Sequence, residues 1–85
     1  MVKAKGKSME PRIFEGDFVI ARKTNELQNG GIYVCINNEE ALIKKIERDE
    51  KNTILISINS EFKPFIAAED FRIQGEVKGI ISRNI

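Results

Sequence analysis

The sequence predicts a mainly β fold, a small coiled antiparallel sheet or partly closed barrel, formed by one domain that spans residues 1–85. Three observations predict it. Short apolar runs rich in β-branched residues alternate with turn residues, amphipathic helical periodicity is almost absent, and two glycines lie inside the last apolar run. A chain of 85 residues is long enough for one small domain and too short for two.

The first half of the chain is expected to contain three strands. Residues 17–21 form a brief apolar strand, and the polar segment after it runs as a loop to a Gly-Gly pair at residues 30–31. Residues 32–36 are the next strand, because this run is too short and too β-branched for a helix. Residues 37–40 make a turn, and residues 41–48 return as the second arm of a hairpin.

The second half continues as an antiparallel meander. A turn at residues 49–52 leads into a strand over residues 53–58, and residues 59–68 are expected to be irregular. The longest strand covers residues 71–82 and contains two glycines in its interior. Such glycines mark a bulge, a sharp bend or a close backbone approach, so the sheet is expected to be strongly coiled.

The last strand also suggests how the chain associates. Strict alternation places Ile73, Val77 and Ile81 on one face with the two glycines, and it leaves Ile80 on the otherwise polar face. A long exposed edge tends to pair or to be protected. The sequence therefore predicts a homodimer.

Composition and charge are those of an ordinary globular domain. Hydrophobic residues make up 41%, charged residues make up 32%, and the formal net charge is +1. There is no broad positive field of the kind that binds a phosphate backbone, so DNA is expected to be bound only through a domain outside this chain. Lys3, Lys5 and Lys7 form a short basic run, for which a solvated terminal arm is favoured over a DNA-contacting arm.

The chain has one cysteine and no histidine. Cys35 cannot form an internal disulfide and no Cys/His set exists for zinc, so no cofactor is predicted. Because Cys35 lies in an apolar run, a buried structural thiol is expected, in a reducing, cytoplasmic compartment. No run approaches the ~20 apolar residues of a membrane span and no signal-peptide pattern opens the chain, so no membrane contact is expected.

Ser8 is the first candidate for chemistry. A serine needs a proton acceptor before it attacks a carbonyl, and without histidine the acceptor must be a lysine. Gly6 and Pro11 place Ser8 on a sharp turn, where its hydroxyl is presented and nearby backbone N–H groups can converge on one position. From this segment alone, a role as the cap of a helical turn over residues 9–13 is favoured, and the two roles are compatible.

Lys44 is the candidate acceptor. Alternate residues of a strand share a face, so Lys44 lies with Leu42 and Ile46, whereas Lys45 lies on the other face. Burial among apolar neighbours lowers the pKa of a lysine and makes the free amine available near neutral pH. The alternative for an isolated lysine is a side chain that extends along a strand edge into water.

Five segments together resemble a known family. They are GKSMEP at 6–11, EGDFV at 15–19, KKI at 44–46, NSEFKP at 59–64 and IQGEVKG at 73–79. In this order they resemble the successive motifs of the LexA-like peptidases. That family includes the C-terminal domains of SOS and phage repressors and the UmuD-type polymerase accessory proteins, and its fold is shared with bacterial signal peptidases.

The resemblance implies a site and an activity. Ser8 would be the nucleophile, Lys44 the general base, and the backbone amides of Lys7 and Ser8 the oxyanion hole. Family members cleave their own linker at Ala-Gly or Cys-Gly when RecA filaments stimulate them, and many dimerise. The chain departs from the family at Lys7, where a small, polar or acidic residue is more usual, and it contains neither Ala-Gly nor Cys-Gly.

The resulting expectation is the C-terminal self-cleavage and dimerisation domain of a LexA-like or phage-type repressor. Its substrate would be its own upstream linker, and a RecA filament would be a co-activator. A UmuD-like polymerase accessory is the main alternative. A signal peptidase fragment is disfavoured because that role needs a membrane anchor, and a non-catalytic β domain with a capping Ser8 and a solvated Lys44 is the remaining alternative.

Overall fold

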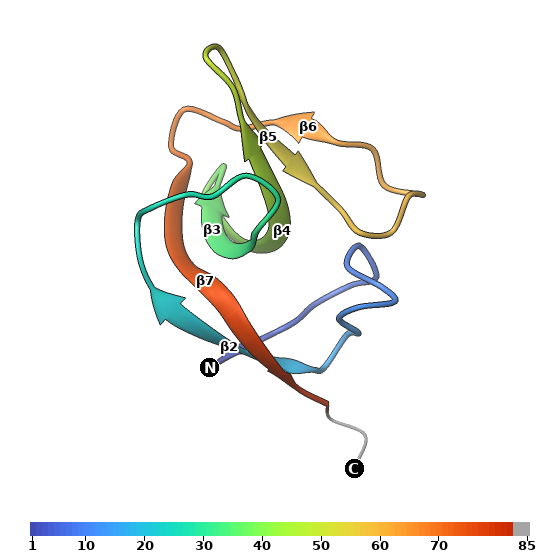
Figure 1. The fold of residues 1–85 in the computed structure, drawn as a ribbon. Coiled ribbons are helices and arrows are strands. Elements are labelled where there is room, and N and C mark those ends of the chain that lie inside the picture. Colours follow the sequence, from blue (N-terminus) through green and yellow to red (C-terminus); the bar gives the residue numbers. More distant parts are fainter. Residues whose placement is uncertain (83–85) are drawn as a thin grey trace.

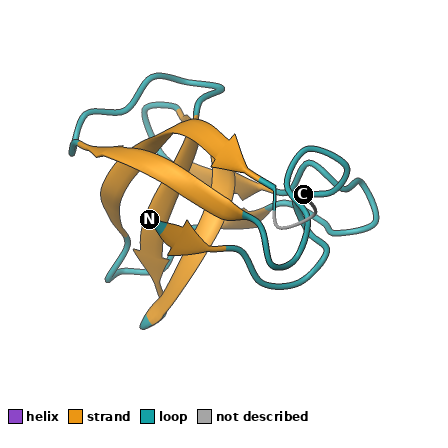
Figure 2. Ribbon diagram, turned by 90° about the horizontal axis from the view of Figure 1, so that it is seen from below, coloured by secondary structure: helices purple, strands orange, loops and turns teal. Residues whose placement is uncertain are grey.

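The structure is a computed structural model that describes residues 1–82, and all regular structure in this range is β (Figures 1 and 2). The strands are β1 (Val2–Lys3), β2 (Phe18–Lys23), β3 (Ile32–Asn37), β4 (Glu40–Arg48), β5 (Thr53–Ile56), β6 (Phe65–Ile66) and β7 (Arg72–Ile81). They form one antiparallel sheet in the order β1-β2-β7-β3-β4-β5-β6. The predicted mainly β antiparallel fold is confirmed, and the sheet stays open because β1 and β6 are its two edges.

The last strand lies in the middle of the sheet. β7 pairs with β2 on one side and with β3 on the other, and its register shifts once against each of them (Figure 1). A Cβ atom at Gly75 would lie 2.8 Å from the backbone oxygen of Arg22, so only glycine allows this approach of β7 to β2. The bulges and the close backbone approach expected from the interior glycines are therefore present.

One of these register shifts reverses a face assignment. Val77 packs against the core, but Ile81, which alternation placed on the same face, is 44% exposed. Ile80 pairs with the fully buried Val19 of β2 and lies on the face of Val77, but it is itself 38% exposed. The predicted faces of Ile80 and Ile81 are wrong because the shift against β2 adds one residue of β7 before them and reverses the alternation.

Two short strands were not predicted. β1 falls in the segment interpreted as a solvated arm, and β6 falls in the segment expected to be irregular. In β1, the half-buried Val2 pairs with Val19, and the next apolar residue, Ala4, is 6% exposed. The alternation of apolar and lysine residues over 2–5 was the available signal. β2 also continues to Lys23, two residues beyond its predicted end.

The core is divided between the two faces of β3. Val34 belongs to one cluster, and its neighbours Tyr33 and Cys35 belong to another, as alternation along a strand requires. The first cluster also contains Ala4, Met9, Ile13 and Val19. The second also contains Ile46 and Leu55. β3 is thus covered on both sides, which explains its nearly continuous apolar sequence.

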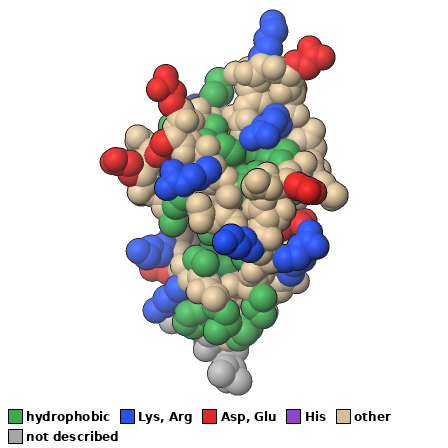
Figure 3. All heavy atoms as spheres, turned by 90° about the vertical axis from the view of Figure 1, so that its left-hand side faces the viewer, with side chains coloured by type: hydrophobic (Ala, Val, Ile, Leu, Met, Phe, Trp, Pro, Cys, Tyr) green, Lys and Arg blue, Asp and Glu red, His purple; other side chains and the backbone are tan. Residues whose placement is uncertain are grey.

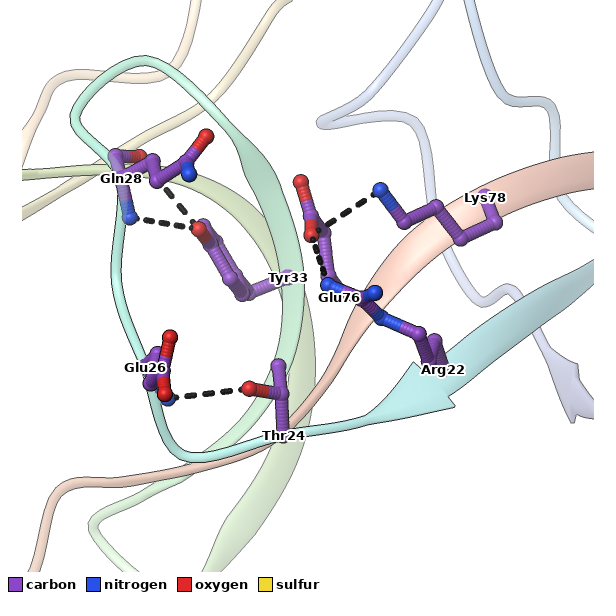
Figure 4. Close-up of polar contacts among 7 residues, drawn as sticks. All are labelled: Arg22, Thr24, Glu26, Gln28, Tyr33, Glu76 and Lys78. Carbon is purple, nitrogen blue, oxygen red and sulfur yellow. Dashed lines mark hydrogen bonds and ion pairs between the residues drawn. The ribbon is translucent and has the colours of Figure 1, made fainter.

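Tyr33 fixes the loop between β2 and β3. The Gln28 amide N–H donates a hydrogen bond of 2.7 Å to the Tyr33 hydroxyl, which is drawn in Figure 4. The ring is fully buried, and a Cβ atom at Gly31 would lie 2.8 Å from it. Figure 4 also shows Glu76 between Arg22 and Lys78, an exposed network between β2 and β7 that adds little stability.

Hydrophobic side chains gather at the end of the molecule beside the last described residues (Figure 3). Ile20 and Ile81 are each 44% exposed and lie on the same side of the β2–β7 pair, because Ile20 is opposite Gly79. We call these two residues the β2–β7 patch. Within residues 1–82, no helix is long and apolar enough to cross a lipid bilayer.

Candidate functional site

Ser8 lies in a tight turn between β1 and β2. Gly6 takes a φ of +77°, a conformation open to glycine, and lets the chain leave the edge of the sheet. The turn closes when the Ile13 N–H donates to the Met9 carbonyl at 2.9 Å. Met9 and Ile13 are 5% and 1% exposed, so burial of both side chains in the first core cluster anchors the turn.

Asn59 ties the turn to the other end of the sheet. Its backbone N–H donates to the Ser8 carbonyl at 2.9 Å, and its side-chain amide donates to the Lys7 carbonyl at 3.1 Å. These bonds join residues about fifty positions apart. They hold two successive peptide units in place, the one that contains the Lys7 carbonyl and the one that contains the Ser8 carbonyl.

Lys44 lies in β4 directly opposite Tyr33 of β3. Its side chain is 7% exposed, and it shares its face of β4 with the fully buried Ile46. The preceding and following residues, Ile43 and Lys45, are both half-buried and point to the opposite face. The predicted choice of Lys44 as the buried lysine is in agreement with this geometry.

The structure brings Ser8 and Lys44 together although 36 positions separate them. Lys44 Nζ lies 2.6 Å from Ser8 Oγ and donates a hydrogen bond to it. Burial lowers the pKa of Lys44 from its ordinary value of 10.5, while Cys35 acts in the opposite direction. Removal of water around the ammonium group is the physical cause, since it favours the neutral amine.

The capping role considered for Ser8 is not seen: among residues 1–82, Lys44 Nζ and no backbone N–H donates to Ser8 Oγ. The turn over residues 9–13 is a single turn, and no helix forms there. The Glu10 N–H, which a capping serine would bind, donates to the Lys7 carbonyl at 3.2 Å instead. The solvated position considered for Lys44 is excluded in the same way by its burial.

Cys35 lies beneath the site as a structural thiol. It is fully buried, and burial raises the pKa of its thiol to about 11, against the opposing effect of Lys44. A thiol with this pKa is neutral at physiological pH and is a poor nucleophile. Within residues 1–82, no three His, Cys, Asp or Glu side chains gather where they could hold a metal ion.

A cleft of about 650 Å³ opens on the pair. One wall is the segment from Val2 to Gly6, and the other is the start of β4 from Glu40 to Ile43; Ser8, Met9, Val34 and Lys44 complete the lining. β5 pairs with β4 only from Lys45 onward, so the first half of β4 presents an unpaired edge to this cleft. An extended peptide can hydrogen-bond to such an edge.

The backbone amides predicted for the oxyanion hole are those of Lys7 and Ser8, in the turn that Asn59 holds. The Lys7 and Ser8 carbonyls are both engaged by Asn59, so this peptide unit is held in one orientation. Within residues 1–82, neither the Lys7 nor the Ser8 N–H donates a hydrogen bond. Neither donor is thus engaged by another group of the described chain, as an oxyanion hole requires.

Sequence reasoning selected Ser8 and Lys44, which the structure brings into contact, and missed the residues that hold the surrounding loops. Asn59 was noticed only as part of a family motif, although an Asn at the end of a strand is a common turn residue. Asp17 was noticed only as the start of a strand and as part of a family motif, and its local role was missed: its carboxylate accepts a 2.9 Å hydrogen bond from the Phe14 N–H and closes the loop into β2. A Gly-Asp pair before an apolar run was the signal for it.

Comparison with known proteins agrees with this geometry. Residues 1–78 match the Peptidase S24-like family. The chain is 38% identical over 85 residues to a LexA repressor of Dechloromonas aromatica, with 95% of this chain and 42% of the relative covered. It is 36% identical over 84 residues to a LexA repressor of Pseudothermotoga lettingae, with 95% and 42% covered.

A third relative, the LexA repressor of Carboxydothermus hydrogenoformans, is 35% identical over 85 residues, with 96% of this chain and 42% of the relative covered. The chain thus spans about two fifths of the length of the curated relatives that it matches. Since the family match extends over nearly all of the strands described above, the chain belongs to the Peptidase S24-like family.

Proposed function

We propose that this chain is the C-terminal self-cleavage domain of a LexA-like repressor and that Ser8 and Lys44 form its catalytic dyad. The observation that carries the proposal is the 2.6 Å contact between Ser8 Oγ and the buried Lys44 Nζ at a cleft. The family match and the similarity to LexA repressors support the same reading.

The geometry supports acyl transfer in two steps. In the first, neutral Lys44 takes the hydroxyl proton while Ser8 Oγ bonds to the carbonyl carbon of the substrate. The negative oxygen formed there is stabilised by the N–H groups of Lys7 and Ser8. Lys44 then gives its proton to the leaving amine, the peptide bond breaks, and an ester remains on Ser8.

In the second step, water cleaves the ester. Lys44 is neutral again and takes a proton from the attacking water, and the proton returns to Ser8 Oγ as the new carboxyl group leaves. The same amine thus acts twice as a base and twice as an acid. A lysine of ordinary pKa could not do this efficiently near neutral pH, so the burial of Lys44 is part of the mechanism.

The proposed substrate is a linker that precedes this domain in the longer protein. The chain contains neither of the Ala-Gly or Cys-Gly bonds cleaved in the family. A linker that enters the cleft as an extended segment would pass Ser8 and could pair with the open edge of β4. DNA binding would reside in the part of the protein outside this chain, and cutting the linker would separate the two parts.

The pH dependence of self-cleavage tests the proposal. In a longer chain that includes the linker, the first-order rate is expected to rise about tenfold per pH unit while Lys44 is mostly protonated. The rate is then expected to level off below pH 10.5, because burial lowers the pKa of Lys44 from that value. Quantitative gel electrophoresis between pH 6 and about pH 11 measures this profile.

Two results would contradict the role of Lys44. One is a rate that does not change with pH over the whole range. The other is a rate that rises tenfold per unit through pH 10.5 and beyond without levelling off, because hydroxide gives this profile whereas a lysine is mostly neutral above its pKa.

We further propose that the domain forms a homodimer through the β2–β7 patch. Its two isoleucines are exposed beside the end of the long central strand, where a second copy could cover them. Sedimentation velocity at rising concentration is expected to show a dimer that Ile20→Asp converts to monomer. Ile66→Asp, at the opposite edge of the sheet, is the matched control. A wild-type chain that stays monomeric at high micromolar concentration would remove the proposal.

A further inference from the structure

The basic run at the start of the chain forms one wall of the cleft. Lys3 and Lys5 line it together with Ser8 and Lys44. Ala4 between them is 6% exposed and packs into the first core cluster, so the two lysines flank a residue that points inward and are themselves exposed. The Ala4 N–H donates to the Asp17 carbonyl at 2.8 Å, which fixes this wall against the loop before β2.

These lysines lack an internal counter-charge. The ion pairs among residues 1–82 join Glu76 to Arg22 and to Lys78, and neither Lys3 nor Lys5 takes part in one. The acidic residue that lines the cleft is Glu40, which is exposed and lies on the opposite wall at the start of β4. Apart from Lys44 itself, the lining carries two positive charges, on Lys3 and Lys5, and one negative charge, on Glu40.

From this arrangement we infer that the cleft selects a peptide segment with an acidic side chain close to the bond that is cut. This inference rests on the proposed peptidase function and names the substrate class of the same site. Lys5 and Ser8 are three positions apart, so their Cα atoms are at most about 11 Å from each other. An extended peptide rises about 3.3 Å per residue, which places the acidic residue within about four positions of the scissile bond.

Lys7 reinforces the same preference. Its carbonyl is held by Asn59, and its exposed side chain lies next to Ser8 in sequence. Lys7 does not line the cleft itself, so Lys3 and Lys5 are the lysines that carry the inference and Lys7 adds a third exposed positive charge near them in sequence. Because the charges are exposed, each contact with an acidic side chain is worth about two- to fivefold in affinity and weakens at high salt.

Peptide binding tests this inference without requiring catalysis. The probes are acetylated, amidated ten-residue peptides with Ala-Gly at the centre and a single Glu, Gln or Lys placed two to four positions to either side. Fluorescence anisotropy measures their affinity for the 85-residue chain that carries Ser8→Ala, which cannot turn them over. The best Glu peptide is expected to bind about tenfold tighter than its Lys counterpart at low salt, and the difference is expected to vanish in 1 M salt.

Charge reversal provides the matched pair of variants. Lys5→Glu, added to Ser8→Ala, is expected to invert the order so that the Lys peptide binds better. Lys51→Glu makes the same change of net charge in the exposed turn between β4 and β5, outside the cleft lining, and is expected to leave the order unchanged. If Lys5→Glu failed to fold, the neutral Lys5→Gln variant would replace it. In that variant, the ratio of the affinities for the Glu and Lys peptides is expected to fall by about two- to fivefold.

The outcomes separate this inference from the peptidase proposal. Inverted binding by Lys5→Glu supports the inference even if the wild-type chain cuts none of the peptides, a result that would count against the peptidase alone. Equal affinity for all peptides, no measurable binding of any of them, or equal effects of Lys5→Glu and Lys51→Glu would overturn the inference. The inference would also be overturned if a short DNA duplex bound to the chain in a Lys5-dependent manner while the peptides showed no charge preference.

Discussion

Replacing Ser8 or Lys44 with alanine is expected to lower the rate of self-cleavage by at least about a thousandfold. Without the hydroxyl there is no nucleophile for the ester intermediate. Without the amine, the Ser8 hydroxyl keeps its proton and the leaving amine receives none. Because each residue depends on the other, the double substitution is expected to be no slower than either single one.

The measurement is the first-order loss of the longer chain at alkaline pH, where wild-type Lys44 is neutral. Lys45→Ala is the matched control, since it removes a neighbouring lysine from the opposite face of β4 and should leave the rate within about twofold. Thermal unfolding of each variant establishes that the domain is still folded. Cleavage that survives Ser8→Ala and Lys44→Ala at the wild-type rate would exclude the dyad.

Replacing Ile46 with alanine is expected to lower the free energy of unfolding by about 2–5 kcal/mol. Ile46 is fully buried in the second core cluster, where it lies with Tyr33, Cys35 and Leu55. Truncation removes apolar contacts and leaves a cavity that the sheet cannot close. A domain of this size is only marginally stable, so this decrease is a large share of its whole free energy of unfolding.

Urea unfolding with linear extrapolation measures this change. Ile66→Ala is the control, because Ile66 is 63% exposed on the edge strand β6 and should lose no more than about 0.5 kcal/mol. Equal losses for the two variants would mean that Ile46 is not part of a closely packed core.

The strands of this fold could be predicted because alternation and turn residues are local signals. The same alternation chose Lys44 over Lys45, and burial of Lys44 agrees with that choice. It failed for Ile80 and Ile81 because one extra residue in β7 reverses the pattern, and nothing in the residues around Lys78 specifies where that shift occurs.

The contact between Ser8 and Lys44 could not be predicted from local patterns. The two residues lie 36 positions apart, and the residue pattern around one gives no information about its distance from the other. The pairing was reached through the absence of histidine, which left lysine as the acceptor, and through the resemblance of ordered motifs to a family. The role of Asn59 could not be found in this way, since its two hydrogen bonds depend on how the whole sheet coils.

The strand order has a consequence for protein synthesis. Ser8 belongs to the part of the sheet that carries β1 and β2, Lys44 belongs to the part that carries β3 and β4, and β7 joins the two parts (Figure 1). β7 is the last of these strands to leave the ribosome. A nascent chain therefore contains both residues before β7 can pair with β2 and β3, and the proposed self-cleavage would have to wait until the final strand has been synthesised.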